Sequence, residues 1–321
     1  MSSNENLIQA ARAGLAEAME SDERVMVLGE DVASGGGPFA LTRGLAERHG
    51  VERVRNTPIC ESTFVGAAVG MALGGARPFV DVMFNDFITI ASDQLFNNAA
   101  KIHFMSGGRF SAPVTIWTVA GAEGRWGAQH SQHLAGWFAQ VPGIKVLSPA
   151  SPVMMRASVL AALDDPDPVV LLVDRPLLYS RAPLANDEAS PWKARVVQVG
   201  SDATIATAGR LVHVAIEASR ASGSSVEIVD LQRIAPLDVD PVVASVEKTG
   251  RLVVAHDEVG CGALGALVET AVYQRAFWAL DAPIARVSAP STPVPTAPNL
   301  EDAYIVEATD IERAIWEVMN P

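Results

Sequence analysis

The sequence predicts an α/β protein with two domains, each built on a sheet of mainly parallel strands. At 321 residues the chain is longer than a single hydrophobic core usually supports, so two domains are expected. Apolar residues make up 49% and charged residues 19%, which is the composition of a compact globular protein. Short Val-rich segments alternate with longer helical patterns in two successive blocks, and this alternation is typical of parallel sheets covered by helices.

The chain begins with an amphipathic helical pattern. The apolar residues that recur at helical spacing are Leu7, Ile8, Ala11, Leu15 and Met19. The first residues resemble neither a signal peptide nor an Arg-rich transit sequence. The longest apolar segments are of strand length or contain glycine and charged residues, so we expect no membrane-spanning helix.

The first block reaches residue 180 and is expected to form the first domain. Each of its strand-like segments is short, Val-rich and followed by a helical pattern. The strand candidates are 25–29, 78–83, 113–119, 144–147 and 169–174. The helix candidates are 61–75, 86–105, 131–139 and 152–164.

Residues 181–193 are expected to link the two domains, because three prolines fall among small and charged residues in PLLYSRAPLANDEASPWK (176–193). Residues 194–321 then form the second domain. Its strand candidates are 204–207, 226–229, 252–255 and 285–287, and its helix candidates are 210–222, 239–248, 262–276 and 309–319. Four prolines in 289–298 predict an extended segment that wraps over a surface or a neighbouring subunit.

Charge and cysteine content limit the partners and the compartment. The formal net charge is −13 and no run of Lys and Arg interrupts it, so neither nucleic acid nor an anionic membrane is an expected partner. Cys60 and Cys261 are too few for a disulfide framework or a zinc cluster. A reducing cytoplasm is therefore the expected location.

The segment CESTFVGAAVGMALG (60–74) holds three glycines spaced four residues apart, at 66, 70 and 74. On a helix they form one stripe where another backbone can come close. Each interior glycine costs about 1 kcal/mol relative to alanine, so three of them imply a compensating gain from close packing. By spacing alone, Glu61 is best interpreted as a first-turn carboxylate favoured by the helix dipole.

The same segment resembles the glutamate motif of thiamine diphosphate enzymes, in which Glu is followed by four residues, Gly, three residues and Gly. Further segments resemble, in order, the beta subunit of 2-oxo acid dehydrogenases (pyruvate or branched-chain) and acetoin dehydrogenases. They are GEDV (29–32), NTPICE (56–61), GARP (75–78), FNDF (84–87), QHSQ (129–132), PGIKV (142–146), DAPI (281–284) and TPVP (292–295). The resemblance implies a thiamine diphosphate-binding, pyrimidine-type first domain and a transketolase-like C-terminal domain.

The resemblance gives Glu61 a catalytic role. In this family its equivalent hydrogen-bonds a ring nitrogen of the cofactor's aminopyrimidine, which then removes the thiazolium proton. An apolar setting suits this role, because burial raises the pKa of a carboxyl group and lets it share a proton. Ile59, Phe64 and Val65 are expected to supply that setting.

By the same resemblance, Met83, Phe87 and Ile90 line the aminopyrimidine pocket, with the Phe87 ring available for stacking. Without the resemblance these three residues would be interpreted as ordinary core.

The resemblance also places His130 at the mouth of the active site, where an imidazole guides proton transfer. His133, three residues on, either shares the site or lies on a solvated face, which is the favoured interpretation. Where many relatives have an Arg-x-Pro sequence this chain has Trp117-Thr118-Val119, and Arg125-Trp126 lies close to the histidine in sequence, so the substrate stays open. Arg125 either binds a substrate carboxylate or pairs with an acidic neighbour.

Relatives hold a potassium ion through backbone oxygens of a turn that follows a helix. Its equivalents here are Ala162, Leu163, Asp165 and Asp167, with a further oxygen from Val114. Such an oxygen-rich turn is equally common as a polar cap, and both interpretations stay open.

The segment GCGALG (260–265) literally matches a dinucleotide-binding fingerprint. The fingerprint needs an acidic residue at the end of the next strand, whereas the strand here runs into Ser-Ala-Pro. Tight packing of strand on helix is therefore favoured. His256, Asp257 and Glu258 before it either reach the cofactor cleft or are polar loop residues.

The Gly-Asp-Gly motif, through which thiamine enzymes bind Mg²⁺ and the diphosphate, does not occur in this sequence. The resemblance therefore implies a separate alpha subunit that holds both, in an α2β2 heterotetramer. It also implies a small-molecule substrate and a lipoyl acyltransferase as acceptor of the acyl group. The alternatives are a split transketolase acting on a sugar phosphate, a non-catalytic subunit and a dinucleotide-binding protein.

Overall fold

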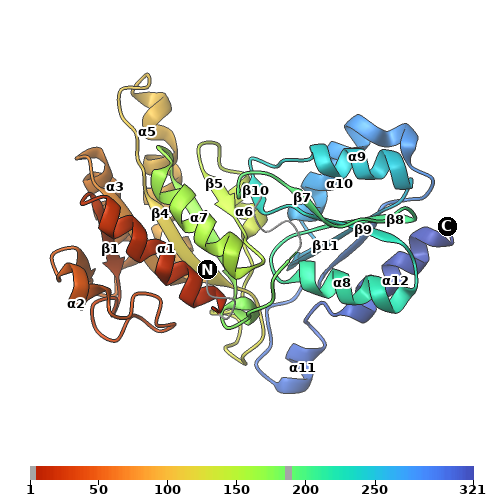
Figure 1. Ribbon diagram of the computed structural model, residues 1–321, viewed down its shortest axis with the longest axis horizontal. Helices are drawn as coiled ribbons and strands as arrows, with labels where there is room; N and C mark the ends of the chain where they lie inside the picture. Colours follow the sequence, from red (N-terminus) through yellow and green to blue (C-terminus); the bar gives the residue numbers. More distant parts are fainter. Residues whose placement is uncertain (1–4, 185–189) are drawn as a thin grey trace.

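The computed structural model describes residues 5–184 and 190–321, which form two α/β domains side by side (Figure 1). The α/β class predicted from the sequence is confirmed. Residues 185–189 of the predicted linker lie outside the described residues. Within the described ranges, no helix is both long and apolar enough to cross a bilayer.

In the described chain, seven strands form the sheet of the first domain, in the order β10-β5-β6-β4-β3-β1-β2. They are β1 (Val25–Gly29), β2 (Val54–Asn56), β3 (Arg77–Phe84), β4 (Thr115–Ala120), β5 (Lys145–Leu147), β6 (Val169–Asp174) and β10 (Arg233–Ala235). All pair in parallel except β10, which is antiparallel to β5. The central strands β4 and β6 are buried along their whole length, as their mainly apolar, Val-rich sequences predict.

Helices cover both faces of this sheet (Figure 1). On one face α1 (Leu7–Ser21) packs against α7 (Pro152–Asp164), with Gly14 allowing close contact with the backbone of Arg156. Capping fixes where both helices begin: Asn6 and Gln9 form a capping box at α1, and Ser151 caps α7. The other face carries α3 (Glu61–Leu73), α4 (Asn85–Ser92), the π-helix η1 (Asp93–Ala99), α5 (Ala100–Met105) and α6 (Ala135–Ala139).

The second sheet has the order β12-β11-β8-β9-β7, of which only β7 is antiparallel to its neighbour. Its strands are β7 (Arg195–Gln198), β8 (Ala203–Thr207), β9 (Val226–Asp230), β11 (Leu252–Val259) and β12 (Ala285–Ala289). The helices around it are α8 (Leu211–Ser222), α9 (Asp240–Thr249), α10 (Leu264–Ala276) and α12 (Ala308–Met319). The short elements are α2 (Leu45–His49), η2 (Arg175–Leu177), η3 (Phe277–Ala279) and α11 (Pro298–Asp302).

Several local expectations were wrong. The strands β2, β7 and β10 were not predicted, because each is short and is interrupted by polar residues rather than continuously apolar. The helix expected at 131–139 begins only at Ala135, since residues 131–134 bind other groups as described below. The helix expected at 86–105 is continuous but includes the π-helical segment η1. The Pro-rich stretch ends at Pro298, which opens α11.

The two domains share one apolar core. A single cluster of buried side chains includes Phe138 of α6, Ile234 of β10 and Val242 of α9. Because β10 lies late in the chain but joins the first sheet, the second domain is fixed against the edge of the first.

Candidate active site

The candidate site lies at the carboxyl ends of the parallel strands of the first sheet. Glu30 follows β1, α4 follows β3, the loop 121–134 follows β4, and Asp174 ends β6. Since parallel strands all end at the same edge, residues distant in sequence meet there.

Glu61 is the first residue of α3, and only 6% of its surface is exposed. Its carboxyl group forms no hydrogen bond or ion pair with any residue that the structure describes. Of the expected apolar neighbours, Phe64 and Val65 are buried, but Ile59 is 82% exposed and does not contribute to the apolar setting. Glu61 therefore combines a buried carboxyl group with an unused hydrogen-bonding capacity.

The carboxyl group of Glu30 lies close to Glu61, and that of Asp81 lies close to Glu30. Burial, and next the negative charge of Glu61, raise the pKa of Glu30. Burial, reinforced by Glu30, raises the pKa of Asp81 to about 7. This part of the site therefore disfavours additional negative charge.

Met83 adopts a left-handed backbone conformation with φ of 53°, which is strained for a residue with a side chain. Its N–H donates to Asp81 Oδ1 at 2.9 Å, which holds this conformation. Met83 and Phe87 are half-buried, whereas Ile90 is 54% exposed and lies on the open surface of this chain.

The His130 ring lies among aromatic side chains. Its centroid is 5.1 Å from that of Phe84 and 5.2 Å from that of Phe87, both nearly edge to face. Trp126 lies 6.3 Å away. The structure thus brings together His130 and Phe87, two residues that the sequence singled out separately.

Arg175, directly after β6, is a site residue that the sequence reasoning missed. Its guanidinium is 5.4 Å from the ring centroids of Phe84 and Trp126, and its Nη2 donates to the carbonyl of His130. The side chain is 8% exposed, burial lowers its pKa, and no ion pair in the described ranges includes it. The feature of the sequence that could have identified Arg175 is its place directly after an apolar, buried strand.

Arg125 pairs with acidic neighbours. Its guanidinium lies 2.6 Å from Glu301 Oε2 and 2.6 Å from Asp302 Oδ1, and its backbone N–H also faces Glu301. Of the two alternatives for Arg125, pairing is therefore the one that the structure contains.

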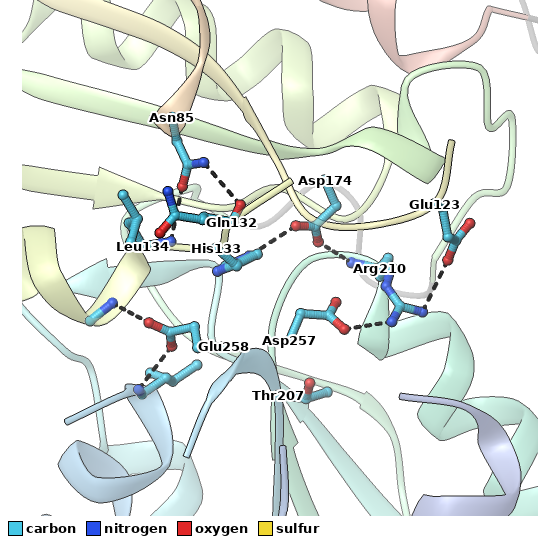
Figure 2. Close-up of polar contacts among 12 residues, drawn as sticks. Asn85, Glu123, Gln132, His133, Leu134, Asp174, Thr207, Arg210, Asp257 and Glu258 are labelled. Carbon is cyan, nitrogen blue, oxygen red and sulfur yellow. Dashed lines mark hydrogen bonds and ion pairs between the residues drawn. The ribbon is translucent and has the colours of Figure 1, made fainter. Parts of the chain in front are cut away.

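Asn85 and Asp86 at the start of α4 hold the residues after His130, and Figure 2 shows Asn85 with Gln132 and Leu134. Asn85 donates to the carbonyl of Gln132 at 2.9 Å and accepts the N–H of Leu134 at 2.9 Å. Gln132 donates to Asp86 Oδ1 at 2.8 Å. These bonds explain why the helix begins later than expected.

A buried polar network connects this loop to the second domain (Figure 2). His133 Nε2 is 3.0 Å from Asp174 Oδ1, and Asp174 Oδ2 accepts the backbone N–H of Arg210 at 2.7 Å. The Arg210 side chain in turn donates to Asp257 at 2.5 Å and lies 3.5 Å from Glu123. The expectation of a solvated face for His133 was wrong, because its side chain is only 11% exposed.

The network fixes the charges of its members. Burial alone lowers the pKa of His133, but the hydrogen bond and charge of Asp174 outweigh it and raise the pKa to about 9. The same interaction outweighs burial at Asp174 and lowers its pKa. Near neutrality the pair is an imidazolium and a carboxylate.

His256, Asp257 and Glu258 are part of strand β11, so the loop interpretation was wrong, and their reach into the cofactor cleft stays a prediction. Glu258 accepts the N–H groups of Gly136 at 2.5 Å and Leu264 at 2.9 Å. Burial lowers the pKa of His256 to about 4, and neither of its ring nitrogens has a partner among the described residues.

Gly265 confirms that GCGALG serves tight packing. A Cβ atom at this position would lie 2.7 Å from His256 Nε2 and 2.5 Å from Arg286 Cδ. Helix α10 can therefore approach β11 only because this residue is glycine.

The expected potassium ligands surround a turn that already carries basic side chains. Lys145 Nζ lies 2.7 Å from Asp165 and 3.0 Å from Asp167. Arg77 donates to the carbonyl of Leu163, and Val169 donates to that of Val114 at 3.0 Å. Each of these carbonyls keeps a second lone pair, and the ion stays a prediction.

Comparisons with known proteins agree with the two-domain α/β fold. Residues 5–180 match the family described as "Transketolase, pyrimidine binding domain", and residues 192–311 match "Transketolase, C-terminal domain". The chain is 40% identical over 317 residues to the acetoin:2,6-dichlorophenolindophenol oxidoreductase subunit beta of Cupriavidus necator, covering 94% of both. It is 39% identical to the pyruvate dehydrogenase E1 component subunit beta of Rhizobium meliloti, covering 97% of this chain and 69% of the relative.

A further relative is the mitochondrial 2-oxoisovalerate dehydrogenase subunit beta of Dictyostelium discoideum, 39% identical over 299 residues, covering 90% of this chain and 80% of the relative. Among solved structures, "Split gene transketolase, inactive beta4 tetramer" has a TM-score of 0.79 at 23% identity and covers 97% of this chain and 96% of its own. At that identity the likeness concerns the fold alone.

Proposed function

Because the chain belongs to the family of beta subunits of thiamine diphosphate-dependent 2-oxo acid and acetoin dehydrogenases, we propose that it supplies half of a shared active site, with Glu61 as cofactor activator. The reaction that fits is decarboxylation of a 2-oxo acid, or cleavage of acetoin, followed by transfer of the acyl group to lipoamide.

The observation that carries this proposal is Glu61, a residue only 6% exposed whose carboxyl group has no hydrogen-bond partner in the described chain. A buried polar group is normally bonded, so an open one indicates a missing ligand. An aminopyrimidine fits, because it offers a ring nitrogen to Glu61 and a flat face to the half-buried Phe87. The strained backbone of Met83 supports the same location for the cofactor, because backbone strain concentrates at functional sites.

Glu61 would hold and return one proton at the ring nitrogen of the pyrimidine. When bound, thiamine diphosphate supplies an acidic carbon that, once deprotonated, attacks the substrate carbonyl. The raised pKa values of Glu30, beside Glu61, and of Asp81, beside Glu30, indicate surroundings that disfavour further negative charge.

His130 would move a proton at the substrate oxygen. The Phe84 and Phe87 rings restrict the imidazole, and Arg175 fixes the carbonyl of the same residue. A positioned imidazole suits general acid–base work.

An alpha subunit completes the site. Membership of the family implies such a partner. We propose that the partner binds Mg²⁺ and the diphosphate in an α2β2 assembly, since Gly-Asp-Gly does not occur in this chain. The exposed apolar side chains of Ile59 and Ile90 are suitable contacts for it. A lipoyl acyltransferase would then accept the acyl group.

A sugar phosphate is the less favoured substrate. A split transketolase needs free cations at the mouth of the site to bind the phosphate. Here Arg125 is paired with Glu301 and Asp302, Arg210 with Asp257, and Arg175 is buried. A 2-oxo acid or an acyloin needs no such cations.

The test is co-expression with the alpha subunit and an assay of thiamine-dependent turnover on pyruvate, branched-chain 2-oxo acids and acetoin. We expect Glu61→Gln to reduce kcat by at least about a hundredfold, because the proton relay is lost. Calorimetry should show that the variant still binds thiamine diphosphate, while Glu47→Gln, at an exposed position, should behave like wild type. Full activity of Glu61→Ala would exclude the proposed role.

A further inference from the structure

Four arginines line one pocket of the first domain, in a chain whose formal net charge is −13. The pocket has a volume of about 570 Å³, which lies in the range of small-molecule sites. The four residues are Arg12, Arg43, Arg48 and Arg181, and among the described residues of the lining Glu5 is the only acidic one. This pocket shares no lining residue with the candidate active site.

Three segments far apart in sequence build the pocket. Helix α1 contributes Arg12, while Arg43 and Arg48 come from α2 and the residues just before it. Arg181 follows η2, and the backbone there is tied to the start of α1 by the hydrogen bond from Leu7 N–H to the carbonyl of Ser180 at 3.0 Å. Tertiary structure, not a run of basic sequence, therefore concentrates the charge.

Most of this charge is not neutralised by the described chain. Arg12 Nε donates to the carbonyl of Leu41 at 3.2 Å, and its Nη2 to that of Ala40, so its partners are neutral. Arg48 pairs with Glu20, which lies outside the lining. The side chains of Arg43 and Arg181 form no hydrogen bond or ion pair with a described residue.

The positive charges also disfavour each other. Partial burial, and next the charge of Arg43, lower the pKa of Arg12. With Arg48 paired, the described lining holds three further guanidinium groups and one carboxylate, Glu5. A pocket of like charges costs free energy unless an anion occupies it.

We propose that this pocket binds a small phosphate-bearing anion. Guanidinium groups match phosphate oxygens through paired N–H donors, and a phosphate carries the multiple negative charge that three unpaired cations favour. The two sources of such a group are free phosphate and a phosphate ester such as a nucleotide.

The experiment uses the assembled complex with its alpha subunit, saturated with thiamine diphosphate and Mg²⁺ so that the cofactor site is occupied. Calorimetric titrations with ADP and, separately, with inorganic phosphate are made at low ionic strength. The test variant is Arg43→Gln with Arg181→Gln, two exposed positions whose side chains support no described contact. The control, Arg220→Gln with Arg313→Gln, removes the same charge from exposed positions of the second domain.

We expect binding to wild type and control, and a loss on the order of tenfold or more for the test variant, because each guanidinium contributes charge-assisted hydrogen bonds. Binding should also weaken as salt rises. Equal affinity for ADP and inorganic phosphate would show that the pocket recognises the phosphate group alone. Tighter binding of ADP would show that it prefers a phosphate ester. Either result supports the site. Absence of binding to the complex, or equal binding by the test variant, overturns the proposal.

Discussion

Glu61 and Arg175 are both buried ionisable residues without a charged partner in the described chain. Burying such a group costs free energy, so each indicates a role that the isolated chain does not complete. For Glu61 the missing group is the cofactor. For Arg175 the role is visible within the chain, because its guanidinium holds the His130 carbonyl and packs on Phe84 and Trp126.

Arg175→Gln is expected to reduce kcat by about tenfold to a hundredfold, because a buried charge-assisted hydrogen bond to the His130 loop is lost. Steady-state kinetics of the assembled enzyme measures this, and KM should change less than kcat. Arg175→Lys should restore little, since an ammonium lacks the planar fork and the stacking surface. An unchanged kcat with a lower melting temperature would show that Arg175 supports only stability.

At the scale of elements, the ends of the strands position the site residues, and glycines determine how closely a helix can pack against its neighbour. Gly265 in α10 faces His256 in β11 with no room for a side chain, whereas Gly70 in α3 has no atom within 4 Å of an added Cβ. The two glycines therefore predict opposite effects of the same substitution.

Gly265→Ala is expected to destabilise the chain by about 1–3 kcal/mol, because the new methyl group overpacks against buried His256. Gly70→Ala is the matched control and should stabilise it by about 0.5–1 kcal/mol through helix propensity. Denaturant unfolding of the purified chain measures both. Equal stability of the two variants would contradict the packing assigned to α10.

At the scale of the whole molecule, the two domains are joined by a shared core and by the polar network. Strand β10 belongs to the second block of sequence but completes the edge of the first sheet beside β5. The pair of His133 and Asp174 adds a charged contact to Arg210 of the second domain.

This pair predicts a pH dependence of stability. In the folded protein the pKa of His133 is about 9, above its ordinary value of about 6.5. Its contribution to the free energy of unfolding is therefore complete below pH 6.5 and is lost as the pH rises through 9. The pKa of Asp174 is lowered, so its contribution is present above its ordinary pKa and is lost only in stronger acid.

Between pH 6.5 and 9.5 we expect wild type to lose on the order of 2 kcal/mol more unfolding free energy than His133→Gln. Urea unfolding across this range measures the difference. His103→Gln, at an exposed histidine, serves as the control and should follow wild type. Parallel pH profiles of wild type and His133→Gln would refute the assignment.

Residues 1–184 expressed alone should not form a stable monomer. Removing β10 leaves the edge of β5 unpaired, and the apolar side chains of α6 lose their partners from the second domain. Size-exclusion chromatography should show aggregation or self-association. A well-folded monomer of this fragment would mean that the domains are independent.

The sequence by itself determined the α/β class, the buried strands, the capped helices α1 and α7, and the family through ordered motifs around Glu61. These follow from patterns between near neighbours in the chain, and local burial and capping act at that range. Tertiary structure alone decided that Arg175 holds the His130 loop, that His133 is buried against Asp174, and that Arg125 pairs with Glu301, 176 residues away. Such contacts depend on which strand ends meet at one edge of the sheet, and no periodicity in the sequence records that.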